Sequence, residues 1–381
     1  MTRRLMAVAL LLLFFCLLQA QNKKWRPINI SIWNPVAIVP FDSLNVSNIN
    51  LGFCSKTNRL NGLSANVFAN FCHQDLNGLL FTGGYNFLHK DMNGLEIAGL
   101  FNVVKGHMHG LQISAIQNTV VRYSKGLMIC GITNFSVGDT KGIQLAGMSN
   151  IAGSRASGIQ FAGGINIASS SSRLFQLAGL VNVCEESIKG VQLGLANYAG
   201  GVRGVQLGLI NICGDDVKGV QIGLINHSSD TSTVKLGLVN VNPKTRIQML
   251  FYSGNVNKIN LGIRFKAHYT YSILGFGTSY KGLDDKFSGS LFYRLGVGIK
   301  FLRVLEISSD AGFYHIQNFE KDGLNGYPKR LYSLQGRLNL ELHPISKLGI
   351  FASGGFAQTR RYGTGVVFEN RPIMECGIVL F

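Results

Sequence analysis

A glycine returns at intervals of 16 residues through much of this chain. The glycines on this grid are Gly62, Gly78, Gly94, Gly110, Gly126, Gly142, Gly158 and Gly190. Leu174 occupies the one slot that lacks glycine, and three shorter units then begin at Gly204, Gly219 and Thr233. These positions mark twelve tandem copies of 14–16 residues. A period of this kind indicates a repeat architecture in which each copy packs only against its neighbours.

Each copy opens with alternating apolar and polar residues. The long form is represented by residues 142–150, with the sequence GIQLAGMSN, and the short form by residues 204–211, with the sequence GVQLGLIN. Positions two and four are apolar, and position three between them is usually polar. Glutamine fills position three at Gln112, Gln144, Gln160, Gln176, Gln192, Gln206 and Gln221. This alternation has the period of a β-strand, and together with the glycines it excludes a helix.

An asparagine closes the motif in all twelve copies. The residues are Asn70, Asn86, Asn102, Asn118, Asn134, Asn150, Asn166, Asn182, Asn197, Asn211, Asn226 and Asn240. One interpretation is a buried ladder in which each side-chain amide bonds to the amide of the next copy. The other is a row of ligand-binding groups. We favour the structural ladder, because a binding site needs a few placed polar groups and not one in every repeat.

Two architectures can use such a unit. In a β-solenoid each copy is one coil of a parallel stack, and in one large transmembrane β-barrel each copy is one spanning strand. Long and short copies differ by one residue in the middle of the motif, Ala146-Gly147 against Gly208 alone. Such a change in a spanning strand turns every later side chain to the other face, whereas a solenoid corner absorbs it. The solenoid is therefore the preferred prediction, with the large barrel as the alternative.

The segment from Arg246 to Phe381 has longer strands with more aromatic residues. Strands are predicted at Ile259–Tyr271, Ser288–Phe301, Leu305–Gln317, Leu331–Leu342, Leu348–Gln358 and Met374–Phe381. Loops are predicted at Asp284-Asp285-Lys286, Glu320–Lys329 and Arg360–Gly363. The ending Ile378-Val379-Leu380-Phe381 resembles the last strand of outer-membrane barrels. This region is therefore expected to form an antiparallel barrel, or else an antiparallel sheet that caps the solenoid.

The chain begins with Thr2-Arg3-Arg4, an apolar stretch from Leu5 to Leu18, and a small residue at Ala20. This order is that of a secretory signal peptide. The expected domains are a signal peptide at 1–20, an N-terminal segment at 21–45, tandem repeats at 46–245 and an antiparallel β region at 246–381. The 47 Gly, 24 Phe and 12 Tyr, with only 14% charged residues, suit strands and turns better than helices.

The net charge of +17 is spread along the repeats and is not clustered. Lys125, Lys141, Lys189 and Lys218 each stand directly before the first glycine of a copy. We interpret them as solvated turn residues, with contacts to anionic glycans or lipid head groups as the alternative. Nucleic acid is not an expected partner. The cysteines that follow the signal peptide lack a Cys-x-x-Cys pair and are predicted to be small, buried space-filling residues. They are Cys54, Cys72, Cys130, Cys184, Cys213 and Cys376.

The units at Gly204–Asn211 and Gly219–Asn226 resemble the short surface repeats of a Bacteroidetes and spirochaete outer-membrane protein family. The resemblance covers roughly Val46 to Asn242. It implies a surface or outer-membrane location, but it indicates almost nothing about a biochemical activity. The early copy Gly62–Asn70 departs from the pattern, because Ser64 and Asn66 replace the usual residues.

Catalytic motifs are absent from the sequence. It holds no Gly-x-Ser-x-Gly, His-Glu-x-x-His or Gly-x-x-x-x-Gly-Lys-[Ser/Thr] segment. His107 and His109 have no third metal ligand near them in the sequence, so no metal or other cofactor is expected. The chain is predicted not to be an enzyme. Expected partners are outer-membrane lipid and a glycan or protein ligand at the repeat face. A channel or transport protein is the alternative function.

Overall fold

The computed structural model describes residues 27–33, 36–38, 46–215, 218–229, 234–267, 269–283, 286–302, 304–319, 327–345 and 347–381. The predicted signal peptide at 1–20 lies outside these residues, as do Thr233, Asp284, Asp285 and most of the predicted loop Glu320–Lys329. The described residues form strands and one 3-10 turn, η1 (Lys281–Leu283). No helix among them is long and apolar enough to cross a membrane.

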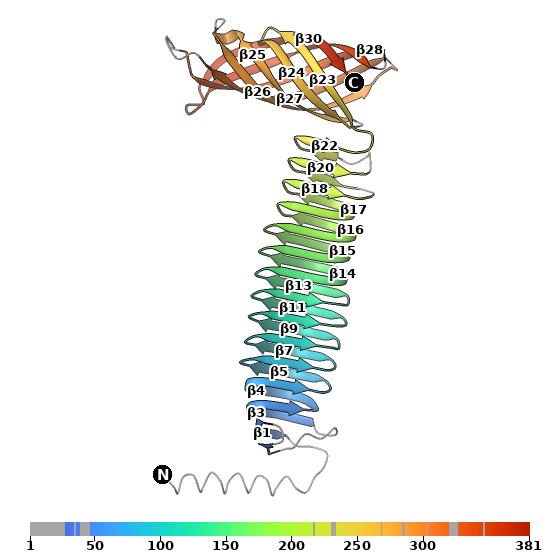
Figure 1. Ribbon diagram of the computed structural model, residues 1–381, viewed down its shortest axis with the longest axis vertical. Helices are drawn as coiled ribbons and strands as arrows, with labels where there is room; N and C mark the ends of the chain where they lie inside the picture. The colour runs from blue at the N-terminus through green and yellow to red at the C-terminus, as the bar shows by residue number, and fades with distance from the viewer. Residues whose placement is uncertain are drawn as a thin grey trace. The chain divides into compact units, whose positions relative to one another are not determined.

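The chain divides into two compact units, Met1–Arg203 and Gly204–Phe381. Strands of the repeats, parallel except for the antiparallel pair β1–β2, make up the first unit and continue into the second (Figure 1). They begin with β1 (Ile28–Trp33), β2 (Val36–Ala37), β3 (Val46–Thr57), β4 (Arg59–Cys72), β5 (Leu76–Thr82), β6 (Tyr85–Leu88), β7 (Met92–Ala98), β8 (Phe101–Val104), β9 (Met108–Ser114), β10 (Gln117–Val120), β11 (Ser124–Cys130) and β12 (Thr133–Ser136). They continue with β13 (Thr140–Ala146), β14 (Ser149–Ala162), β15 (Ile165–Ala178), β16 (Val181–Leu193), β17 (Ala196–Leu207), β18 (Ile210–Cys213), β19 (Val220–Ile222), β20 (Ile225–Ser228), β21 (Val234–Leu236) and β22 (Val239–Val241).

Each copy of the repeat is one coil of a parallel β-solenoid, which confirms the preferred architecture. The first strand of a copy pairs with the first strand of the next copy, as β9, β11 and β13 do. The second strands pair likewise through β10, β12 and β14. The register places identical positions above one another, so that Gly126 pairs with Gly142 and Asn118 with Asn134. Because β1 already pairs in parallel with β3, this pairing begins before the expected boundary at Val46.

The glycine grid has a steric cause. Gly94 and Gly110 have φ of 134° and 138°, in a region that other residues rarely adopt. A Cβ atom built on Gly94 stands 2.0 Å from the carbonyl oxygen of Gly78 in the preceding coil. Close stacking of the backbones therefore favours glycine at this position near the start of the first strand, although Leu174 occupies it in one coil. The mid-motif length change falls at the tight corner, which is Gly147-Met148 in a long copy and Gly208-Leu209 in a short one.

The carboxy-terminal strands close into an antiparallel barrel, in which β23 pairs with both β24 and β30. An open capping sheet is thereby excluded. The barrel strands in the described part of the chain are β23 (Arg246–Gly254), β24 (Asn257–Lys266), β25 (Thr270–Tyr280), β26 (Ser288–Lys300), β27 (Leu305–Asn318), β28 (Arg330–Ile345), β29 (Leu348–Arg361) and β30 (Val367–Leu380).

The predicted strand list for this region was wrong at its beginning. It omitted β23 and fused β24 with the start of β25 into Ile259–Tyr271. The chain turns there with a hydrogen bond of 2.9 Å from the Ala267 amide to the Thr270 carbonyl, and the residues at this point include neither glycine nor proline. The usual sequence signal of a turn is therefore missing. Met374–Phe381 was also too short, because β30 begins at Val367.

Candidate functional site

The closing asparagines bond to one another in columns inside the repeats. All twelve are 2% exposed or less. In the first unit the Nδ2 atom of each residue from Asn86 to Asn182 donates to the Oδ1 atom of the next, over 2.8–3.0 Å. In the second unit Asn211 donates to Asn226, and Asn226 to Asn240, over 2.8 Å. Asn70 donates instead to the hydroxyl of Ser64, at 2.7 Å.

The asparagine amides from Asn86 to Asn182 also bond to backbone in the next coil. Asn150 Nδ2 donates to the carbonyl of Phe161 at 2.8 Å, to Asn166 Oδ1 at 2.9 Å and to the carbonyl of Gln144 at 3.2 Å. The carbonyl of Phe161 lies near the end of β14, close to the tight corner of its coil. The asparagine column therefore satisfies the corner backbone and ties neighbouring coils together. The amide nitrogens from Asn86 to Asn182 are therefore occupied by protein partners.

Position three of the copies forms a second buried column. In this column the side-chain amide of one copy bonds to that of the copy before it. Gln160 Nε2 donates to Gln144 Oε1, and Gln176 Nε2 donates to Gln160 Oε1, both at 2.8 Å. Glu96 occupies this column and is fully buried, and it accepts from Gln112 Nε2 at 2.8 Å. Burial raises the pKa of the Glu96 carboxyl to about 8, although the bond from Gln112 opposes the shift. Lys235 stands in the same column and donates to the carbonyl of Val241.

The cysteines and histidines do not assemble into a site. Cys54, Cys72, Cys130, Cys184 and Cys213 are buried thiols, whereas Cys376 is exposed, contrary to its predicted burial. Burial raises the pKa of the Cys72 and Cys130 thiols to about 11 and of Cys184 to about 12, so these thiols stay protonated and unreactive at neutral pH. Within the described ranges, no group of three or more His, Cys, Asp or Glu residues is placed to hold a metal ion.

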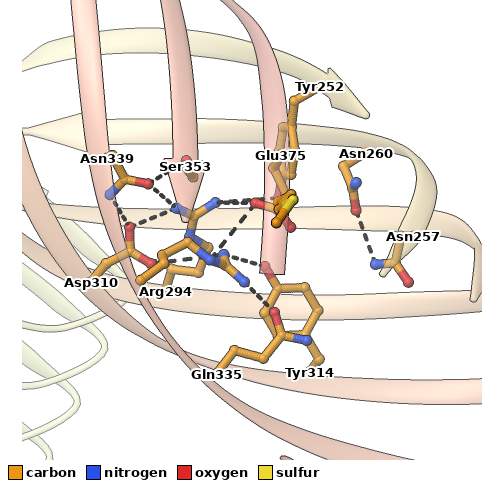
Figure 2. A network of polar contacts seen from close by, with 12 residues as sticks. Tyr252, Asn257, Asn260, Arg294, Asp310, Tyr314, Gln335, Asn339, Ser353 and Glu375 are labelled. Atoms are coloured by element: carbon orange, nitrogen blue, oxygen red, sulfur yellow. Dashed lines mark hydrogen bonds and ion pairs between the residues drawn. The ribbon is translucent and has the colours of Figure 1, made fainter. Parts of the chain in front are cut away.

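The barrel interior holds a network of buried charges that sequence reasoning did not anticipate (Figure 2). Arg294, on β26, makes a two-point contact with Asp310 on β27, with Nε–Oδ1 2.8 Å and Nη2–Oδ2 2.6 Å. Arg337, on β28, lies 3.8 Å from Asp310 and 3.7 Å from Glu375 on β30. The two guanidinium groups and two carboxylates balance in charge, and none of the four side chains is more than 2% exposed.

Neutral groups complete this network. Asn339 Nδ2 donates to Asp310 Oδ2 at 2.7 Å, and its Oδ1 accepts from Ser353 Oγ at 2.6 Å. Arg337 Nη1 donates to the hydroxyl of Tyr314 at 2.7 Å. A signal for this interior exists in the sequence, because polar residues alternate with leucine along β28: Ser333, Gln335, Arg337, Asn339 and Glu341 are buried, whereas Leu334, Leu338, Leu340 and Leu342 are exposed.

A second charged group lies toward the barrel end at which the chain enters. Arg264 pairs with Glu341 at 2.7 and 2.8 Å, and Lys266 pairs with Glu306. Beside Glu306 is a cavity of about 460 Å³. Its lining includes the cations Lys244, Arg246, Lys266 and Lys300, the carboxylate of Glu306, and the imidazole of His343. Cations outnumber carboxylates in this lining, so the chemistry of the cavity suits an anionic group such as a phosphate.

No protein family, curated protein or solved structure matches this chain.

Proposed function

We propose that this chain is a non-catalytic outer-membrane repeat protein, anchored by its barrel and carrying its repeats as an envelope scaffold. The observation that carries the proposal is the distribution of residues across the barrel wall. Apolar side chains cover the outside, and the inside holds most of the polar and charged side chains together with a cluster of buried aromatic and aliphatic residues. Barrels in lipid have this arrangement, and barrels in water have the opposite one.

Aromatic residues at both ends of the barrel support this assignment. Phe287, Phe319 and Tyr362 are exposed at one end, and Tyr269 and Phe301 are exposed at the other. Aromatic side chains favour the boundary between lipid and water, where they form girdles around membrane barrels. The apolar band between the two ends includes Leu338, which is 66% exposed.

The barrel interior favours an anchor over the alternative, a channel. The interior of an eight-stranded barrel is just wide enough for its own side chains. Here the Arg294, Asp310, Arg337 and Glu375 network fills it with paired charges. A solute crossing the lumen would have to break these buried pairs, which costs roughly 3–5 kcal/mol for each pair that is left open.

Loop lengths support a position for the repeats on the periplasmic side. The chain enters the barrel at Arg246 and leaves it at Leu380, and both residues lie at the end that carries the short connections 267–269, 301–304 and 346–347. The opposite end carries the longer connections 281–287, 319–329 and 362–366, together with the short turn 255–256. Outer-membrane barrels have short periplasmic turns and longer external loops. The repeats therefore face the periplasm and are not displayed on the cell surface.

Heat-modifiable migration of the full chain tests the anchor. The folded barrel in detergent is expected to migrate differently on unboiled and boiled gels. Leu338→Arg puts a charge on the lipid face of β28 and should weaken insertion by roughly 2–4 kcal/mol. Thr364→Arg is the matched control, because Thr364 is exposed in a connection between strands. A chain that neither fractionates with outer membrane nor refolds in detergent contradicts the proposal.

Protease shaving of intact cells tests the position of the repeats. A tag inserted at Thr364 is expected to be accessible from outside, whereas the repeats become cleavable only after the outer membrane is opened. Cleavage within the repeats of intact cells would assign them to the cell surface and would refute the periplasmic position, while leaving the barrel anchor intact.

A further inference from the structure

The outer surface of the repeats is apolar, as is that of the barrel. In the coil 124–139, Asn134 and Ser136 point inward and are buried. Leu127 and Ile129 on the first strand, and Phe135 on the second, point outward. Ile132, at the tight corner between these strands, is 42% exposed. Water therefore meets apolar side chains on both broad faces of this coil and at the corner that joins them.

Stacking repeats this surface from coil to coil. The corner column includes Leu100, Ile132, Met148 and Leu180, which are 39–61% exposed. From residue 76 to residue 203 the coils extend for about 40 Å, and the apolar path around each coil is about 30 Å. We name this surface the apolar wedge: the outward residues of the first and second strands and the corner between them. Its area is on the order of 1,000 Å², whereas soluble monomers rarely expose patches larger than a few hundred Å².

Exposed charges lie only on the opposite edge of these coils. Between residues 76 and 203, every exposed charged side chain falls at least three positions after the closing asparagine of one copy and before the first position of the next. The strands β14 to β17 run through this edge without a break. This loop edge carries nine Lys or Arg residues and four Asp or Glu residues. Lys125 and Lys141 are typical cations on it. An apolar surface flanked by an excess of cations complements a lipid layer, whose acyl chains lie beneath phosphate groups.

The shape of the wedge discriminates between lipid and a second copy of the chain. A dimer formed through one broad face leaves the other face and the corner in water, because the three surfaces together are convex. Lipid can cover a convex surface on all three sides. Contact with lipid also leaves little backbone unpaired, because β9, β11 and β13 and their neighbours bond to strands on both sides.

We infer that the apolar wedge of the repeats is embedded in phospholipid acyl chains, with the loop edge at the head groups. On the periplasmic side this lipid is the inner leaflet of the outer membrane. The inference goes beyond the proposed function, in which only the barrel contacts lipid. It stands on the repeats alone, so it can hold even if the barrel assignment fails.

Fluorescence in vesicles tests the wedge in the full-length chain. Trp25→Phe and Trp33→Phe remove the native tryptophans. Phe135→Trp then reports from the wedge, and Tyr123→Trp reports from the loop edge directly before the same coil. In vesicles of phosphatidylglycerol and phosphatidylcholine with brominated acyl chains, we expect quenching of the Phe135→Trp reporter to exceed that of the Tyr123→Trp reporter at least threefold. The order should reverse with aqueous acrylamide.

A second wedge reporter, Phe161→Trp, guards against a local failure to fold, and protease resistance of each variant is checked first. Equal quenching of wedge and loop-edge reporters by brominated lipid would overturn the inference. Weak quenching of the wedge reporters by both brominated lipid and acrylamide would overturn the inference as well. That result would indicate that a second copy of the chain covers the wedge. Heat-modifiable migration of the same samples shows separately whether the barrel is folded.

Discussion

The polar groups buried in the repeats are mostly neutral amides, whereas those at the centre of the barrel are charged, and each set lies beside a cluster of buried apolar residues. Asn150 bonds to a copy of itself above and below. Arg294 bonds to Asp310, a different residue that is held in place by Arg337 and Asn339. A self-complementary polar group can be iterated without limit, because each new coil brings its own partner. A network of unlike charges is complete only when every member is present.

The largest expected difference between the two regions is their tolerance of deletion. Removing the copy Gly142–Ser157 should shorten the stack by about 4.8 Å and leave it folded, because Asn134 then meets Asn166 as it met Asn150. Removing one barrel strand, β27 (Leu305–Asn318), reverses the direction of every later strand and should prevent closure. Protease resistance and heat-modifiable migration of the two variants measure the contrast.

A deletion of two copies, Gly142–Arg173, serves as the control. A stack of coils should fold equally well after the deletion of one copy or of two copies, because each coil packs only against its neighbours. If the two-copy deletion folds and the one-copy deletion does not, the copies behave as antiparallel strands and the comparison between the two regions fails.

The sequence predicts much of the repeat region and less of the barrel. The glycine grid and the asparagines predict coils, because steric and hydrogen-bonding needs recur at the same position in every coil. Alternation at Ile143, Gln144 and Leu145 predicts a strand, but a period of two does not say which face is buried. The inward position of Gln144 depends on its ladder partners in other coils. The Arg294–Asp310 pair joins the adjacent strands β26 and β27. The register of these strands could not be predicted, because the barrel sequence contains no repeat that would indicate it.

The second prediction concerns Glu96, the one carboxylate in the buried glutamine column of the first unit. Its folded-state pKa of about 8 lies above the ordinary value of 4.5. The folded state therefore holds its proton more tightly. The associated stability is fully present below pH 4.5 and is lost as the pH rises toward 8. Glu96→Gln should remove this loss, because an amide at this position can accept from Gln112 Nε2 without carrying a charge.

The urea midpoint of the full chain measures this effect. At pH 8 the Glu96→Gln variant should be more stable than the parent by roughly 2–4 kcal/mol, and near pH 4 the two should converge. Glu185→Gln is the matched control. Glu185 is exposed on the loop edge, so its substitution should change stability by less than about 0.5 kcal/mol. A Glu96→Gln difference that does not vary with pH would show that the pKa of Glu96 in the folded state is not raised above its value in the unfolded chain.

The smallest expected effect is the loss of one asparagine from its column. Asn150→Ala removes three donated bonds and the bond accepted from Asn134 at 2.9 Å. It leaves the carbonyl of Phe161 and the amide of Asn134 each short of a partner in a buried site. The cost should be roughly 1–3 kcal/mol, with the coils on either side retained.

Ser149→Ala is the matched control, because Ser149 lies next to Asn150 on the outward face and bonds only to Thr133 at 2.8 Å among the side chains described. Urea midpoints of the two variants are the measurement. Equal midpoints would mean that solvent or backbone rearrangement replaces the amide, and the asparagine column would then contribute to the register of the coils and not to their stability.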